Sequence, residues 1–132
     1  MYLHKAIYEN IGPIESAQID LPFHESGNPK PLIIVGENGT GKSTVLSNIV
    51  DAFYEMAGKK FSNAQPSNDE GRGSQYFKAI AGNEVHSGAS YLVSYLSFGE
   101  AKKHQYAFKC GKVSSNEFFE RNKITPAPLS WN

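Results

Sequence analysis

Cysteine is scarce in this sequence, neither sign of charge is in excess, and no long apolar run is present. The single cysteine, Cys110, excludes an internal disulfide framework, so a reducing, cytoplasmic setting is expected. Because 13 basic side chains balance 13 acidic ones, net charge gives no argument for a nucleic-acid partner, although a local basic patch stays open. The apolar runs are too short for a signal peptide or a membrane span, which predicts a soluble protein with no membrane partner.

The 132 residues are 39% hydrophobic and 20% charged, which is typical of a globular chain, and their number suits a single domain. Side chains alternate in character over residues 2–9 and 17–21, which predicts two strands joined by a turn at residues 10–13. The first alternation predicts one better-buried face. Residues 32–35, Leu-Ile-Ile-Val, form a continuous apolar run, which predicts a strand buried on both faces at the centre of a sheet.

A helix is predicted over residues 43–57, with Gly58 as its C-terminal cap. Its apolar side chains recur at helical spacing at Val45, Leu46, Ile49, Phe53 and Met56. Polar residues, glycine and proline then dominate residues 59–75. Because this stretch has little apolar surface to bury, we predict a mobile loop there.

A second hairpin is predicted from residues 91–96 and 106–108, whose side chains alternate on either side of a glycine-containing corner. Three basic residues in this corner, Lys102, Lys103 and His104, could touch nucleic acid, but such a tip is usually only solvated. A helical turn is predicted at residues 116–122. His86 and Cys110 have no partners in the sequence that would favour a metal site or a nucleophile.

The most informative stretch is a glycine-rich loop between the predicted strand at 32–35 and the predicted helix. It matches the Walker A pattern, in which four residues separate a first glycine from the sequence Gly-Lys-Ser. We predict that this loop binds ATP through Gly36, Glu37, Asn38, Gly39, Thr40, Gly41, Lys42, Ser43 and Thr44. The glycines let backbone N–H groups surround the phosphates, and the positive end of the helix dipole adds to the attraction.

Three side chains of this loop have specific predicted roles. Lys42 places its ammonium between the β- and γ-phosphates, and Thr44 lies near the α-phosphate. Ser43 donates its hydroxyl oxygen to Mg²⁺, so ATP and Mg²⁺ are the predicted cofactors and Ser43 is the predicted metal ligand. An ordinary glycine-rich turn is the alternative, but strand, loop and helix stand in the order that the phosphate motif requires.

The wording of the loop, Gly-x-Asn-Gly-x-Gly-Lys-Ser-Thr, resembles that of ABC-type ATPases, whose relatives include the SMC and RecF proteins and the OLD (overcoming lysogenization defect) nucleases. The opening strand followed by Asn10-Ile11-Gly12-Pro13-Ile14 resembles the first lobe of the SMC and RecF branch. The similarity covers residues 1–58 well and the later hairpin only in outline. It implies an α/β fold: a P-loop NTPase, the N-terminal lobe of an ABC-type ATPase head with antiparallel β-hairpins beside a P-loop strand-helix unit. Residues 1–132 are thus expected to form a single, partial domain.

The resemblance also implies partners. Proteins of this family act as ATP-gated dimers, in which two ATP molecules lie between two heads and closure is coupled to work on DNA. A second ATPase head and DNA are therefore expected partners, beside ATP itself. In the transporter branch an aromatic residue of an early strand stacks on adenine. Tyr8 lies at a comparable position, although a tyrosine on an early strand more often belongs to the core.

Residues for hydrolysis are not evident. In this family hydrolysis needs an acidic pair after an apolar strand, a glutamine loop, and a signature loop from the opposite subunit. No run of four apolar residues here ends in Asp-Glu, and no glutamine follows a strand convincingly. Leu96-Ser97-Phe98-Gly99-Glu100 resembles the signature, but Phe98 replaces a glycine and a strand follows in place of a helix, so a hairpin corner is predicted. No catalytic residue is assigned, and this chain alone is expected to be inactive.

The sequence favours one function and leaves two alternatives open. The first is the ATP-binding portion of an SMC-, RecF- or OLD-like ATPase that works on DNA, in repair or in defence against phage. The second is a stand-alone, non-hydrolysing nucleotide-binding module that a partner protein completes. The third, an ABC transporter ATPase, is weaker because no true signature appears. The gene sequence after residue 132 would distinguish the first two functions. A long heptad region with a distal Asp-Glu strand would support the first, and a stop codon would support the second.

Overall fold

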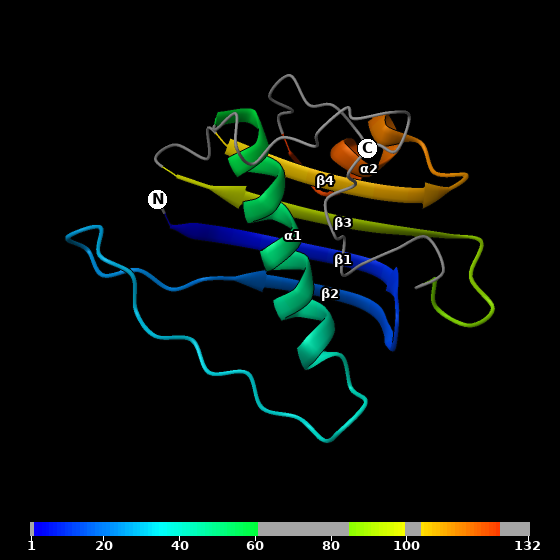
Figure 1. Cartoon of the computed structure of the whole chain (residues 1–132), viewed down its shortest axis with the longest axis horizontal. Coiled ribbons are helices and arrows are strands. Elements are labelled where there is room, and N and C mark those ends of the chain that lie inside the picture. The colour runs from blue at the N-terminus through cyan, green and yellow to red at the C-terminus, as the bar shows by residue number, and fades with distance from the viewer. Residues whose placement is uncertain (1, 61–84, 100–103, 125–132) are drawn as a thin grey trace, which may run out of the picture.

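The computed structural model describes residues 2–60, 85–99 and 104–124, with only the backbone described for residues 55–60. In this part of the chain one antiparallel sheet has the strand order β2-β1-β3-β4. Its strands are β1 (Leu3–Ile11), β2 (Ile14–Asp20), β3 (Tyr91–Phe98) and β4 (His104–Gly111). Helix α1 (Lys42–Lys60) crosses one face of the sheet, and helix α2 (Ser115–Arg121) packs on the other (Figure 1).

Both predicted hairpins and the predicted helical turn are present. β1 pairs with β2 across the turn Gly12-Pro13, and β3 pairs with β4 along its whole length. The predicted turn at residues 116–122 is α2, which begins where the side chain of Ser114 accepts a hydrogen bond from the N–H of Glu117. Antiparallel pairing of β1 with β3 joins the two hairpins into one sheet, and therefore both strands are central.

The central strands are buried on both faces. Ala6, Ile7 and Tyr8 are consecutive in β1 and all are buried, because α1 covers one side of the strand and α2 the other. The prediction of one better-buried face for residues 2–9 is therefore wrong. Alternation in residue type reports only a local pattern, whereas burial of both faces depends on a helix packing on each side.

The prediction of a buried central strand at residues 32–35 is also wrong for this structure. The segment belongs to no strand and pairs with no other segment of the described residues. Its side chains are exposed, with Ile33 at 82% and Val35 at 88%. A central strand requires a hydrogen-bonded neighbour and cover on both faces, and residues 2–60, 85–99 and 104–124 supply neither.

Helix α1 begins one residue before the predicted start and runs past Gly58, so the cap assigned to Gly58 is wrong. A glycine inside a helix costs only about 1 kcal/mol relative to alanine, so it does not by itself end one. Lys59 and Lys60, predicted to open a mobile loop, belong to the helix, and residues 61–75 lie outside the described residues.

Only part of the apolar surface predicted for α1 is buried. Val45 and Ala52 are buried against the sheet, and Ile49 is partly buried there. Leu46 and Phe53 are exposed, although the Phe53 ring lies 5.5 Å from that of Phe98, and the side chain of Met56 lies outside the described residues. The helix thus carries a second apolar face, with these exposed members: Leu46, Val50, Phe53 and Tyr54.

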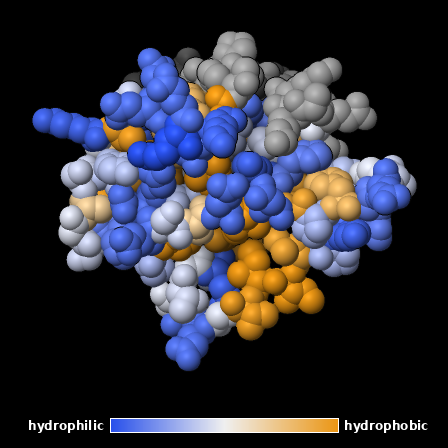
Figure 2. Space-filling view, turned by 180° about the vertical axis from the view of Figure 1, so that it is seen from behind, coloured by the Kyte–Doolittle hydropathy of each residue, from blue (hydrophilic) through white to orange (hydrophobic). Residues whose placement is uncertain are grey.

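The exposed side chains of residues 32–35 add to the apolar surface of the molecule. Figure 2 shows an apolar patch low on the back of the molecule, where the segment that leads into the glycine-rich loop runs in Figure 1. A monomeric soluble protein rarely leaves so many neighbouring large apolar side chains exposed, and such surfaces usually mark interaction sites.

Candidate nucleotide-binding site

The start of α1 is held firmly against the sheet. Val45 is buried in the core, and its N–H donates to the carbonyl of Gly41 at 3.1 Å, which begins the helix. One turn later the buried Asn48 donates from Nδ2 to Oγ of Ser94 on β3 at 2.9 Å. No acidic residue lies in the first turn of α1, so the positive end of the helix dipole is left for an external anion.

The loop before α1 turns tightly on its glycines. Gly39 and Gly41 have φ angles of 84° and 106°, in the left-handed region that side chains disfavour. Thr40 closes the turn internally, because its Oγ1 donates to the carbonyl of Glu37 at 2.7 Å. A Cβ added at Gly39 would meet nothing within 4 Å, so the backbone there is open to a ligand.

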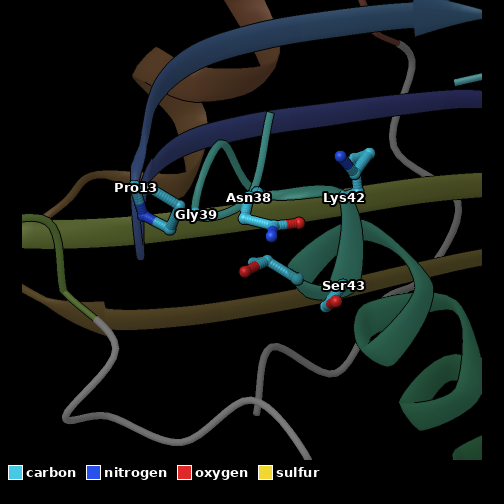
Figure 3. A pocket seen from close by; sticks show the side chains of 7 residues that line it. Pro13, Asn38, Gly39, Lys42 and Ser43 are labelled. Atoms are coloured by element: carbon cyan, nitrogen blue, oxygen red, sulfur yellow. The ribbon is translucent and has the colours of Figure 1, made fainter. Parts of the chain in front are cut away.

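An open cleft of about 360 Å³ lies at this loop, within the range of small-molecule sites. Its walls are formed by Pro13, Asn38, Gly39, Gly41, Lys42, Ser43 and Thr44. Figure 3 shows Pro13, on the β1–β2 turn, beside Asn38 and Gly39, with Lys42 and Ser43 in the first turn of α1. No carboxylate is among the lining side chains of the described residues, so the cleft suits a polyanion.

Lys42 folds back onto its own loop. Its Nζ donates to the carbonyl of Gly36 and, at 3.2 Å, to the carbonyl of Glu37. The ammonium is therefore held beside the loop by weak neutral acceptors. Phosphate oxygens carry a full charge and accept stronger hydrogen bonds, so a triphosphate can draw the ammonium toward itself.

The nine predicted residues lie in the loop and in the first turn of α1 that follows it. Asn38, Gly39, Gly41, Lys42, Ser43 and Thr44 line the cleft. The other three residues stabilise the loop: the carbonyls of Gly36 and Glu37 accept from Lys42, and Thr40 donates to the carbonyl of Glu37. Ser43 is exposed at the helix start, as a metal ligand that shares its ion with phosphates and waters must be.

Sequence reasoning missed the contribution of the β1–β2 turn. Pro13 lines the cleft, and Ile14 packs so close to Gly41 that a Cβ there would lie 2.5 Å from its Cγ1. Asn-Ile-Gly-Pro indicates a turn, but the sequence gives no sign that this turn meets the loop. The hairpin is brought there by the packing of α1 on the sheet.

Tyr8 is not available for stacking on adenine. It is 0% exposed and lies in the core beneath α1, so that suggestion is wrong. Its hydroxyl has no hydrogen-bond partner within the part of the chain that the structure describes. Tyr8 lies on a central strand that is covered by α1, so its ring is packed in the core and cannot reach solvent.

Replacing Tyr8 with Phe is expected to raise the free energy of unfolding by about 1 kcal/mol, because a buried hydroxyl without a partner costs desolvation. Burial also raises the pKa of the Tyr8 phenol above its ordinary value of 10.0. At a pH above 10.0 the phenol therefore ionises only in the unfolded state, and the stability of the wild-type protein falls as the pH rises. The variant loses that contribution. Denaturant titrations at neutral pH and above 10.0 measure both effects; a clear loss of stability at neutral pH would contradict this account.

The other sequence candidates have structural roles. Leu96 to Phe98 form the end of β3, which pairs with β4, and Gly99 follows with a φ of 77°. The signature-like segment thus leads into the β3–β4 hairpin, whose predicted corner lies outside the described residues from residue 100 to residue 103. His104 opens β4, whereas Lys102 and Lys103 lie outside the described residues. The ring of His86 contacts the carbonyl of Gly12 at 2.8 Å, a partner that the sequence did not suggest. Residues 2–60, 85–99 and 104–124 hold no metal-type cluster of three or more His, Cys, Asp and Glu.

Comparison with known proteins agrees with this geometry. A family model described as an AAA domain matches residues 5–124, nearly the whole chain. The chain belongs to the AAA domain family. Its resemblance to ATPases built on the Walker A loop is thereby confirmed, and this AAA domain has the P-loop NTPase fold.

A solved structure from work on ATP-driven dimerization and DNA-stimulated activation of SMC ATPases is similar to this AAA domain, with a TM-score of 0.40 and 18% sequence identity. The match covers 96% of this chain and 82% of that one. No curated protein matches the sequence significantly. Among the described residues of the AAA domain, no helix is long and apolar enough to cross a membrane.

Proposed function

We propose that this AAA domain is the ATP-binding portion of an SMC- or RecF-like ATPase that couples ATP binding and hydrolysis to work on DNA, in repair or in defence against phage. The observation that carries the proposal is the glycine loop at the start of α1, which opens a cleft lined by Lys42 and Ser43 and free of carboxylates among the described residues. The particular residues of this loop, Gly-x-Asn-Gly-x-Gly-Lys-Ser-Thr, favour the SMC and RecF branch.

In this proposal each element of the cleft has a defined task. Backbone N–H groups of the loop and the uncompensated end of α1 hold the phosphates. The Lys42 ammonium leaves the carbonyls of Gly36 and Glu37 for the β- and γ-phosphates. The exposed Ser43 hydroxyl suits Mg²⁺, which takes few protein ligands and keeps several waters, and the bound ion would neutralise phosphate charge. Pro13 offers an apolar wall to the nucleoside.

The described residues that line this cleft do not include the groups that accelerate hydrolysis. Side chains that bind ground state and transition state equally well give affinity without catalysis. A positioned water and added charge at the departing γ-phosphoryl group lower the barrier, and no described side chain of the cleft is a carboxylate or glutamine that could orient water. We propose that a second ATPase head or a further part of the same protein supplies these groups.

The exposed apolar surface supports this need for a second component. Residues 32–35 offer apolar side chains and a backbone that pairs with no other described segment, and the second face of α1 is apolar as well. Both surfaces lie next to the cleft along the chain, on either side of the loop. The stand-alone module completed by a partner protein remains the alternative, because the same surface would serve it.

The expected result for the purified chain at saturating Mg-ATP is phosphate release no faster than that of a Lys42→Ala variant. Binding without turnover follows from a cleft that holds phosphates but orients no water. A phosphate-release assay of both proteins measures this, with nucleotide binding by calorimetry as the accompanying control. Turnover by the wild-type chain clearly above that of the variant would mean that a catalytic group lies in this chain. It would contradict the proposal that a second head or a further part of the protein supplies the catalytic groups.

A further inference from the structure

We infer that His86 is a positioning residue for the nucleotide site, which acts by holding the β1–β2 turn in place. The inference rests on the proposed ATP-binding function. His86 stands shortly before β3, far from the loop in sequence, and is not among the residues that line the cleft. Its influence on the nucleotide must therefore pass through other residues.

The segment at His86 holds three successive residues of the β1–β2 region. The main-chain N–H of His86 donates to the carbonyl of Asn10 at 2.8 Å. Its ring Nδ1 lies 2.8 Å from the carbonyl oxygen of Gly12. Since a carbonyl oxygen can only accept, Nδ1 carries the proton and donates it. Between these contacts, Val85 forms an antiparallel bridge with Ile11.

The turn held in this way has a backbone that needs support. Asn10 and Gly12 have φ angles of 54° and 52°, both in the left-handed region. A non-glycine residue persists there only where its surroundings fix it. The two carbonyls that accept from His86 belong to these two residues. His86 therefore holds the turn at Asn10, where the positive φ is strained, and at Gly12, where the freedom of glycine would otherwise let the backbone change conformation.

The β1–β2 turn also supports the phosphate-binding loop. Pro13, next to Gly12, forms a wall of the cleft. Ile14 fills the space beside Gly41, where an added Cβ would lie 2.5 Å and 2.8 Å from two of its carbons. A displaced turn would withdraw both contacts and leave the loop free to open. Preorganisation of the loop, and with it nucleotide affinity, thus depends on the hydrogen bond from His86 to Gly12.

The experiment compares ATP affinity, by calorimetry at a temperature where all variants are folded, among the wild-type chain, His86→Ala, His86→Gln and His86→Asn. The asparagine amide places an N–H where Nδ1 of histidine stood, and the glutamine amide extends one bond further. We expect alanine and glutamine to weaken binding roughly two- to thirtyfold, and asparagine to restore most of it. Amide exchange of residues 10–14 without nucleotide should be faster in the alanine variant.

Asn122→Ala is the matched control, because it also removes one side-chain hydrogen bond to a carbonyl, from Nδ2 to Phe118 at 2.9 Å, but in α2. Its ATP affinity should equal that of the wild-type chain. Absence of ATP binding by the wild-type chain itself would overturn the proposed function and the inference together. Binding by His86→Ala equal to wild type, or equal losses in all three His86 variants and Asn122→Ala, would overturn the inference alone.

Discussion

Lys42→Ala is expected to weaken ATP binding by about 1.5–3 kcal/mol, roughly 10- to 150-fold in Kd, because the phosphates lose their one dedicated point charge in this loop. The backbone N–H groups and the end of α1 remain, so binding is weakened and not abolished. Among the described residues the Lys42 ammonium donates to two carbonyls of its own loop, so its removal should change the free energy of unfolding little. Isothermal titration calorimetry with Mg-ATP measures the affinity.

Lys5→Ala provides the matched control for charge. Lys5 lies on β1 and its Nζ is 3.4 Å from a carboxylate oxygen of Asp20, which is partly exposed to solvent. Loss of such a pair costs little, and it removes the same positive charge from the chain as the Lys42 variant does. ATP affinity should be unaffected. Equal affinities of wild type and Lys42→Ala, with both proteins folded, would mean that nucleotide does not bind at this loop.

Gly41→Ala is expected to lower the free energy of unfolding by about 2–4 kcal/mol and to abolish the cleft as it stands. Two costs add at this position. The φ of 106° disfavours any side chain, and the new Cβ would lie 2.5 Å from Cγ1 and 2.8 Å from Cδ1 of Ile14. Either Ile14 or the loop must move. Denaturant titration of purified protein measures the loss, and calorimetry measures the fall in ATP affinity.

Gly39→Ala separates the two costs. Gly39 has a similar φ of 84°, but an added Cβ meets no heavy atom within 4 Å. Backbone strain alone should therefore act there, at about 1–2 kcal/mol. A further test combines Gly41→Ala with Ile14→Ala. The double variant should lose less stability than the sum of the two single losses, because the smaller side chain at position 14 relieves the collision. Equal stabilities of the two glycine variants would show that Ile14 does not press on Gly41.

The candidate site was more predictable from sequence than its surroundings. Contiguous residues form the loop, and the task proposed for each follows from local chemistry: glycine for a positive φ, lysine for charge, and serine, by proposal, for a metal ion. The walls beyond the loop could not be predicted in this way. Pro13 and Ile14 reach it from the β1–β2 hairpin, and His86 reaches the hairpin from the approach to β3. Contacts between segments distant in sequence leave no periodic signal in either.

Errors at the level of single elements have related causes. Residues 32–35 have the composition of a buried strand, but a strand exists only with a hydrogen-bonded neighbour, which the described residues do not supply. Gly58 follows the last apolar residue of the helical pattern, which predicts a cap, but the cost of a glycine is a small term beside helix packing. The position of Tyr8 along the chain suggests a contact with adenine, but pairing within the sheet places its side chain in the core beneath α1.

By itself, the sequence determined the two hairpins, the helical segment after the glycine loop and the α2 turn, because each depends on residues near one another in the chain. The tertiary structure alone decided that β1 pairs with β3, that α1 and α2 cover opposite faces, and which apolar side chains stay exposed. These are outcomes of long-range packing, in which one surface competes with another for the same partner. Local patterns do not record that competition, and so the fold had to be seen before Pro13, Ile14 and His86 could be connected to the site.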